Sequence, residues 1–141
     1  MRTEKGVALV VYKKKRGKKR FLILKRNKNW EGWEIPKGHL EDEDYTKTVK
    51  QELREEAGIP EEKIEQIENL NQDLEWTYTD EEGQEVKREY RGYMVETSEA
   101  ASVDVTQNPH EEHETGFFMK KEDVKSLLTY ENQKELLNLA T

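Results

Sequence analysis

Three glutamates that share one face of a predicted helix are the clearest sign of chemistry in this sequence. Glu52, Glu55 and Glu56 stand at positions i, i+3 and i+4 in the stretch KQELREEAGI, a spacing that brings side chains together on a helix. None of their i±3 and i±4 neighbours is lysine or arginine. Each close like-charge pair therefore costs roughly 0.2–0.5 kcal/mol, and more when it is desolvated. A hard divalent cation with oxygen ligands, Mg²⁺ or Mn²⁺, would supply the missing charge, and a distant lysine or arginine is the alternative.

The helix that must position these carboxylates is expected from about Asp44 to Ala57. Its buried stripe recurs at every fourth residue and consists of Tyr45, Val49, Leu53 and Ala57. The glutamate face borders this stripe, so the carboxylates are expected at the rim of the core, partly desolvated. Gly58 and Pro60 end the helix, as a C-terminal glycine and a following proline commonly do.

The rest of the chain alternates strands and helices, which predicts an α/β (α+β) fold. Strands are expected at residues 6–12, 20–26, 33–35, 64–70, 74–79, 85–96 and 115–119, and short helices at 121–128 and 130–140. The first two strands form a hairpin around the basic turn KKKRGKK, and a second hairpin surrounds DEEGQ. Residues 98–113 are polar and are expected to form a loop. The length predicts a single domain over residues 1–141.

Composition excludes several classes of protein. The net charge of −7 gives no general attraction to nucleic acid, so no long nucleic acid is expected as a partner, and a polyanionic substrate would need local cations or a metal. Cysteine is absent, which excludes disulfides and thiolate metal sites. No segment approaches the roughly 20 apolar residues that span a bilayer. We expect a cytoplasmic protein that is a monomer or a homodimer.

The stretch from Gly38 to Ile59 resembles the Nudix hydrolase signature, G-x5-E-x7-R-E-U-x-E-E-x-G-U, where U is aliphatic. Here Gly38 opens the box, and Glu43 precedes QELREEAGI by seven residues. The lead-in WEIPKG also resembles that of the family. Two positions depart from the signature: the segment from Gly38 to Glu43 is one residue short, with Asp44 as the alternative match, and Gln51 replaces the arginine of the family. The resemblance implies an α/β/α sandwich with a central mixed β-sheet.

Beyond the box, the chain resembles the diadenosine-tetraphosphate hydrolase branch of the family. The C-terminal stretch EEHETGFFMKKEDVKSLLTYENQKELLNLA matches that branch's pattern of a Glu-His pair, a short strand and two small helices. The aromatic hairpin WTYTDEEGQEVKREYRGYMV precedes it. The resemblance implies an acid-anhydride hydrolase that cleaves a dinucleoside polyphosphate to ATP and AMP with Mg²⁺ or Mn²⁺.

The resemblance also implies roles for individual residues. The metal ligands would be Gly38, through its carbonyl, together with Glu52, Glu55, Glu56 and Glu112. Either Glu52 or Glu112 would be the catalytic base, and Glu43 and Gln51 would support the ligands from outside. Substrate contacts are expected from Lys37, Arg26 and Arg88 to phosphates and from Trp76, Tyr78 and Tyr90 to a base. Alternate residues of a strand share a face, so about half of the hairpin aromatics are expected to be core.

Other interpretations remain open at this stage. The same chemistry on a nucleoside triphosphate, ADP-ribose or an RNA 5′ end is one, and a nucleotide-binding module that has lost catalysis is another, because Gln51 lacks the charge of arginine. His110 and His113 offer a transition-metal site, although a loop histidine is more often a plain solvated residue. The acidic stretch EDEDY lacks the spacing of an EF-hand, which argues against a calcium protein.

Overall fold

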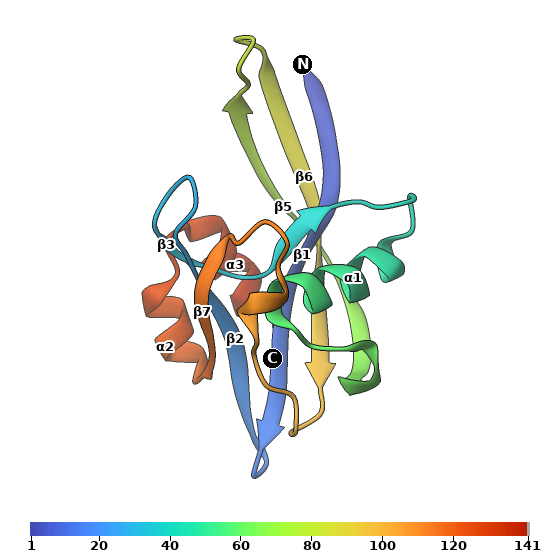
Figure 1. Ribbon diagram of the computed structural model, residues 1–141, viewed down its shortest axis with the longest axis vertical. Helices are drawn as coiled ribbons and strands as arrows, with labels where there is room; N and C mark the ends of the chain where they lie inside the picture. Colours follow the sequence, from blue (N-terminus) through green and yellow to red (C-terminus); the bar gives the residue numbers. More distant parts are fainter. Residues whose placement is uncertain (141) are drawn as a thin grey trace.

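A seven-stranded mixed sheet organises the structure, a computed structural model in which residues 1–140 are described (Figure 1). The strands are β1 (Arg2–Lys15), β2 (Lys18–Arg26), β3 (Gly32–Glu34), β4 (Lys37–His39), β5 (Ile64–Thr79), β6 (Glu85–Thr97) and β7 (His113–Met119). Their order is β3-β2-β1-β6-β5, with β4 pairing with β1 and β7 pairing with β2. The central pair β1–β6 is parallel and the other pairs are antiparallel. The sheet therefore has the mixed character that the resemblance implied.

Helices cover both faces of this sheet. Val7, Leu9 and Val11 of β1 pack in one core cluster with residues of α1 (Tyr45–Ala57). Ala8 and Val10 point the other way, into a second cluster with residues of α2 (Lys121–Leu127) and α3 (Glu131–Leu139). Because β1 is buried on both faces, its sequence is an unbroken apolar run. The expected α/β/α sandwich is confirmed.

The helix α1 begins and ends where its capping residues predict. The Asp44 carboxylate accepts a hydrogen bond from the Lys47 backbone N–H at 3.0 Å, an N-cap contact. At the other end Gly58 adopts a left-handed φ of 67° and donates its N–H to the Arg54 carbonyl. The carboxylates of α1 were expected at the rim of the core and partly desolvated. Two of them are more deeply buried than that, since Glu56 is 3% exposed and Glu52 is 9% exposed.

Several strand boundaries differ from the sequence-based expectation. β5 is one continuous strand from Ile64 to Thr79, whereas two strands were expected. The interruption in the apolar pattern is a register shift between Asn69 and Asp73, where Asn71 has a φ of 57°. Such a bulge breaks the alternation of side chains without ending the strand. β1 is also longer than predicted at both ends, and β7 begins two residues earlier, at His113.

The connection from β6 to β7 includes a short 3-10 helix, Val105–Gln107, and a second 3-10 turn, Glu61–Lys63, follows α1. The Asp104 backbone N–H donates to the Ala57 carbonyl at 2.7 Å, which ties the connection to the end of α1. Throughout the described part of the chain, helices are too short or too polar to cross a membrane.

Candidate active site

The carboxylates of α1 face the turn between β3 and β4. Glu56 accepts a hydrogen bond through Oε2 from the Lys37 backbone N–H at 2.9 Å. Its Oε1 is buried and has no hydrogen-bond partner among residues 1–140. The Glu52 carboxyl group lies against the Cα of Gly38, so closely that a Cβ at this position would overlap it. The glycine of the predicted box is therefore required here by the close approach of a glutamate.

Burial and mutual repulsion oppose ionisation of both carboxyl groups. Burial, followed by the charges of Glu55 and Glu112, raises the pKa of Glu52 to about 8. Burial, followed by the charges of Glu52 and Glu34, raises the pKa of Glu56 well above its usual value. The repulsion between neighbouring carboxylates that the sequence predicted is therefore also present in the folded structure. A divalent cation fits this group of residues, because it would neutralise both charges and occupy the unpartnered oxygen of Glu56.

A second buried carboxylate, Glu34 of β3, was not anticipated by sequence reasoning. Its side chain is fully buried and is surrounded by His113 Nε2 at 2.6 Å, Lys37 Nζ at 3.0 Å and Arg26 Nη1 at 3.2 Å. Burial opposes its ionisation, but the hydrogen bond from His113 and the charges of Lys37 and Arg26 outweigh it and lower the pKa to about 2. An ionised carboxylate only accepts hydrogen bonds, so the proton of this contact resides on His113 Nε2.

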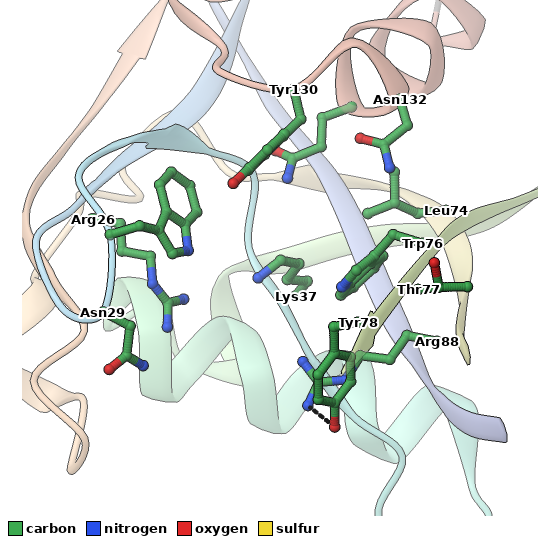
Figure 2. A pocket seen from close by; sticks show the side chains of 12 residues that line it. Arg26, Asn29, Lys37, Leu74, Trp76, Thr77, Tyr78, Arg88, Tyr130 and Asn132 are labelled. Atoms are coloured by element: carbon green, nitrogen blue, oxygen red, sulfur yellow. Dashed lines mark hydrogen bonds between the residues drawn. The ribbon is translucent and has the colours of Figure 1, made fainter. Parts of the chain in front are cut away.

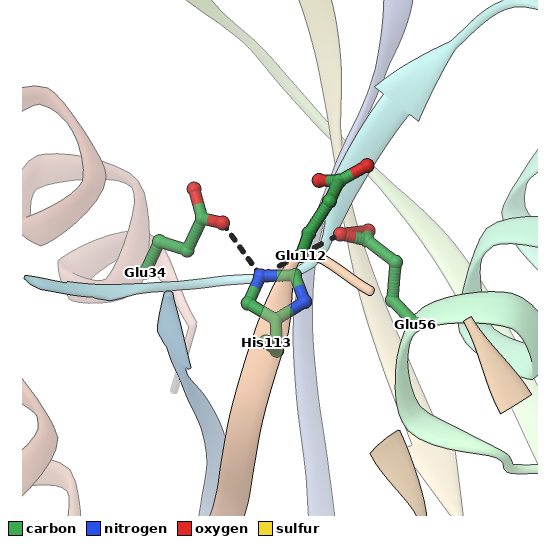
Figure 3. A group of neighbouring side chains, drawn as sticks. All are labelled: Glu34, Glu56, Glu112 and His113. Carbon is green, nitrogen blue, oxygen red and sulfur yellow. Dashed lines mark hydrogen bonds and ion pairs between the residues drawn. The ribbon is translucent and has the colours of Figure 1, made fainter. Parts of the chain in front are cut away.

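Glu112, in the loop before β7, is a fourth carboxylate beside Glu34, Glu52 and Glu56, and these four residues form the carboxylate cluster. The Oε2 of Glu112 accepts a hydrogen bond from Arg26 Nη1 at 3.0 Å. Polar side-chain atoms of Glu34, Glu56, Glu112 and His113 lie within 4.8 Å of one another, and the three carboxylates among them can ligate a metal (Figure 3). Three elements that are distant in sequence thus deliver carboxylates to one place, which is the arrangement a metal site requires.

A cavity of about 490 Å³ adjoins the carboxylate cluster (Figure 2). It is lined by Arg26, Asn29, Trp30, Lys37, Leu74, Trp76, Thr77, Tyr78, Arg88, Tyr130, Asn132 and Gln133. Arg26 and Lys37 belong to both regions, since each also pairs with Glu34. Aromatic rings can stack on a nucleobase and the neighbouring cations can bind phosphates, so the cavity suits a ligand with both groups.

The structure separates the predicted substrate residues into two groups. Arg26, Lys37, Arg88, Trp76 and Tyr78 line the cavity, which leaves their substrate contacts a prediction. Arg88 also pairs with Glu4 at 2.9 Å.

Tyr90 does not line the cavity, which corrects the expected base contact. It is 3% exposed, lies in the core and meets the Trp76 ring edge to face at a centroid distance of 5.0 Å. Its hydroxyl group hydrogen-bonds with His39 Nδ1 at 3.1 Å, while its neighbour Trp76 lines the cavity. Arg26 is also not a free phosphate ligand, since its Nη1 is engaged by two carboxylates.

The two departures from the family signature have clear local structures. Gln51 Nε2 donates to Glu55 Oε1 at 3.2 Å, so the amide supports a carboxylate without adding charge. Glu43 lies in an exposed turn and has no hydrogen bond or ion pair within the described chain, so it does not contact the cluster as an outer partner. The shortened segment bends through Asp42 and Glu43, whose φ values of 53° and 57° are unusual for residues with a side chain.

The sequence contains a signal for the buried carboxylate of Glu34, but none for the pairing of Trp30 with Tyr130. Glu34 stands between Trp33 and Ile35 in a short strand, and a carboxylate inside an apolar strand needs buried partners. Trp30 and Tyr130 line the cavity with their rings at 5.1 Å, but they are 100 residues apart, and nothing in the local pattern joins them. His110 remains in the loop, with its backbone N–H bonded to Asn108.

Comparison with known proteins agrees with this geometry. A family model for the NUDIX domain matches residues 2–139. A solved structure of a Caenorhabditis elegans Ap4A hydrolase in a binary complex shares 25% identity, with 96% of this chain and 93% of that chain covered and a TM-score of 0.74. The comparison with curated proteins gives no match.

More distant structures share the fold alone. The NUDIX domain of Shewanella oneidensis NrtR, solved with ADP ribose, has 17% identity over 99% of this chain and 87% of that chain, with a TM-score of 0.74. The dihydroneopterin triphosphate pyrophosphohydrolase of E. coli has 12% identity over 99% and 97%, with a TM-score of 0.75. Since the family model spans nearly the whole sequence, this chain belongs to the Nudix family of pyrophosphohydrolases.

Proposed function

We propose that this protein hydrolyses phosphoanhydride bonds of dinucleoside polyphosphates such as diadenosine tetraphosphate, with Mg²⁺ or Mn²⁺ as cofactor. The proposal rests on the way that the carboxylate cluster and the aromatic cavity meet. A carboxylate cluster with too little positive charge adjoins, through Arg26 and Lys37, a cavity that is lined by aromatic rings. A polyphosphate chain with a base at its end matches both halves.

Glu52, Glu56 and Glu112 are the side chains that would hold the cation, with Glu55 and the Gly38 carbonyl as further ligands. Their carboxylate oxygens are the hard ligands that Mg²⁺ prefers. The buried Oε1 of Glu56 supports this assignment, because it has no hydrogen-bond partner in residues 1–140 and lies 3.9 Å from His113 Nε2. When bound, the cation would stabilise negative charge on the phosphoryl group and lower the pKa of a nearby water.

Lys37 is the best placed residue for binding the phosphate chain. Its Nζ lies 3.0 Å from Glu34 and 5.8 Å from the centre of the Trp76 ring, between the carboxylates and the cavity. A lysine serves well as a compact charge beside a phosphate. Arg88 lies further along the cavity, with its guanidinium 4.5 Å from the centre of the Tyr78 ring. The two cations would bind successive phosphates and keep the chain extended across the site.

Aromatic residues around the cavity provide the binding surface for a base. Trp30, Tyr130, Trp76 and Tyr78 all line the cavity, and the rings of Trp30 and Tyr130 meet at a centroid distance of 5.1 Å. Stacking of a base on an aromatic ring contributes about 1–3 kcal/mol and tolerates different bases. The rings would therefore hold one nucleoside while the phosphates reach the carboxylates.

Of the two candidate bases, Glu52 is the better placed to accept a proton from the attacking water. Glu112 already accepts a hydrogen bond from Arg26 through Oε2, so this oxygen is engaged within the protein. The carboxyl group of Glu52 lies directly against Gly38, and a general base must lie within reach of the attacking water. We assign proton acceptance to the Glu52 carboxylate oxygen that does not hold the cation, and cation binding alone to Glu112.

Incubation of the purified protein with diadenosine tetraphosphate and Mg²⁺ tests the proposal. Chromatography should show ATP and AMP in equal amounts, and Glu56→Gln should reduce the rate at least 100-fold while leaving the fold intact. The exposed Glu62→Gln variant serves as the control for removal of one carboxylate. A parallel panel with ADP-ribose, nucleoside triphosphates and 5′-triphosphorylated RNA separates other Nudix activities.

Two outcomes of the panel would overturn the proposal. Faster turnover of another nucleotide than of diadenosine tetraphosphate would reassign the substrate. Saturable nucleotide binding without turnover of any member would instead identify a binding module that has lost catalysis.

A further inference from the structure

Arg26 lies behind the carboxylate cluster and is held on several sides. Its Nη1 donates to Glu34 at 3.2 Å and to Glu112 at 3.0 Å, and its Nε donates to the Lys28 carbonyl at 2.9 Å. The guanidinium also lies 5.5 Å from the centre of the Trp30 ring, and its side chain is only 11% exposed. A guanidinium with this many fixed contacts is a rigid element of the site.

The same end of β2 also holds the backbone of the loop that carries Glu112. The Asn27 backbone N–H donates to the Glu112 carbonyl at 3.1 Å. The pairing of β2 with β7 shifts register between Lys25 and Arg26, as in a β-bulge. Bulges re-aim side chains at the edges of active sites. Here Arg26 is paired with His113, and Glu112 lies where its carboxylate reaches the guanidinium.

Electrostatic repulsion makes this anchoring necessary. Carboxylate oxygens of Glu112, Glu34 and Glu56 lie within 4.8 Å of one another, so Glu112 stands among like groups. Its side chain is 24% exposed on a loop, so repulsion alone would move it toward solvent. Gln51, at the position of the arginine of the family signature, contributes no charge to the cluster. Arg26 supplies positive charge from the opposite side.

We propose that Arg26 is a positioning residue that holds Glu112 in its cation-binding position before the cation arrives. Glu34 fixes Arg26 in turn, because it is fully buried and accepts from Arg26 and His113. This inference rests on the proposed function only in naming Glu112 as a cation ligand. It differs from the sequence-based expectation that Arg26 binds a phosphate directly.

Calorimetric titration with Mn²⁺ in the absence of nucleotide provides the decisive measurement. Arg26→Gln should weaken Mn²⁺ binding by about 10–100-fold, the range typical of residues that orient metal ligands. Arg26→Lys retains the charge and should recover part of this loss. Arg20→Gln is the matched control, because Arg20 lies near the other end of β2 and, within residues 1–140, its guanidinium hydrogen-bonds to the backbone carbonyl of Lys19 and to no carboxylate.

A double-mutant cycle shows whether Arg26 acts through Glu112. If it does, the variant with both Arg26→Gln and Glu112→Gln should bind Mn²⁺ within about twofold of Glu112→Gln alone, since coupled residues are not additive. In steady-state assays, Arg26→Gln should lower kcat and require more metal, with little change in the KM for nucleotide at saturating metal.

Three results would overturn the inference. Unchanged Mn²⁺ affinity together with a raised KM would make Arg26 a phosphate ligand, and fully additive losses in the cycle would separate it from Glu112. If Arg26→Gln does not fold, the Mn²⁺ titration of Arg26→Lys provides the test. A Mn²⁺ affinity of Arg26→Lys equal to that of the unaltered protein would contradict positioning by the guanidinium group. Absence of nucleotide turnover by the unaltered protein would refute the proposed function but leave the metal titration as a valid test.

Discussion

Replacing Glu52 with glutamine tests the unbalanced charge of the carboxylate cluster directly. Burial raises the pKa of this carboxyl group from the usual 4.5 to about 8. The pKa of Glu52 is higher in the folded state than in the unfolded state, so the folded state binds the proton more tightly. The stability that this proton contributes is complete below about pH 4.5 and is lost as the pH rises through about 8. The metal-free protein should therefore lose stability between these values.

The size of the effect follows from the same numbers. At about 1.4 kcal/mol for each pKa unit, a rise from 4.5 to about 8 sets a limit of about 5 kcal/mol. Water entry and side-chain relaxation reduce this limit, because the effective dielectric constant of buried sites is nearer 20 than 4. Glutamine imitates the neutral carboxyl group, so Glu52→Gln should be about 2–4 kcal/mol more stable than the unaltered protein at pH 8.5 and nearly equal to it at pH 4.5.

Urea denaturation in EDTA across pH 4.5–8.5 measures this difference. Glu62→Gln, at an exposed position, corrects for the general removal of one negative charge from an acidic protein. Addition of Mg²⁺ should stabilise the unaltered protein most at high pH and should stabilise Glu52→Gln much less. Parallel pH profiles of the unaltered protein and Glu52→Gln in EDTA would refute the reasoning, because they would show that the Glu52 charge is already balanced within the protein.

Three further predictions concern residues around the cluster. Glu34→Gln should lower the free energy of unfolding by about 3–5 kcal/mol, measured by urea denaturation, because it leaves buried cations without their counter-charge; a change below 1 kcal/mol would contradict the role of this carboxylate. Trp30→Ala should raise the KM for the nucleotide about 5–100-fold, in line with loss of about 1–3 kcal/mol of stacking, with kcat nearly unchanged in steady-state assays; a fall in kcat alone would argue against base stacking. Glu43→Gly should raise the melting temperature by a few degrees, because it relieves a left-handed conformation worth about 1–2 kcal/mol; a lower melting temperature would show that the turn depends on the Glu43 side chain.

The sheet and helices were largely predictable because their signals are local. The buried stripe of α1, its capping residues and the apolar run of β1 each lie within a few consecutive residues. The two strands expected in place of β5 show the limit of this approach. A bulge around Asn71 interrupts the alternation while the hydrogen-bonded pairing with β6 continues on both sides, and only the partner strand reveals that.

The candidate site was predictable only where its residues share one element. The glutamates of α1 follow from helix geometry, whereas the contacts of Glu34 with Arg26 and His113 join strands separated by up to 79 residues. No local pattern reports a buried ion-pair network of that kind. The placement of Tyr90 was missed for a related reason, because burial along β6 depends on what covers each position, in this case Trp76.

The parallel pairing of β1 with β6 also shapes how the chain folds. Arg2 pairs with Val86, and the register continues to Lys13 with Thr97, so every contact of this central pair spans 84 residues. At about 5–20 residues per second, synthesis of the intervening chain takes several seconds. During that time β1 can pair with β2 and β4, which precede β6 in the chain, but not with its long parallel partner. Closure of the sheet must therefore be a late step, and non-local pairing of this kind places folding in the slower range of single domains.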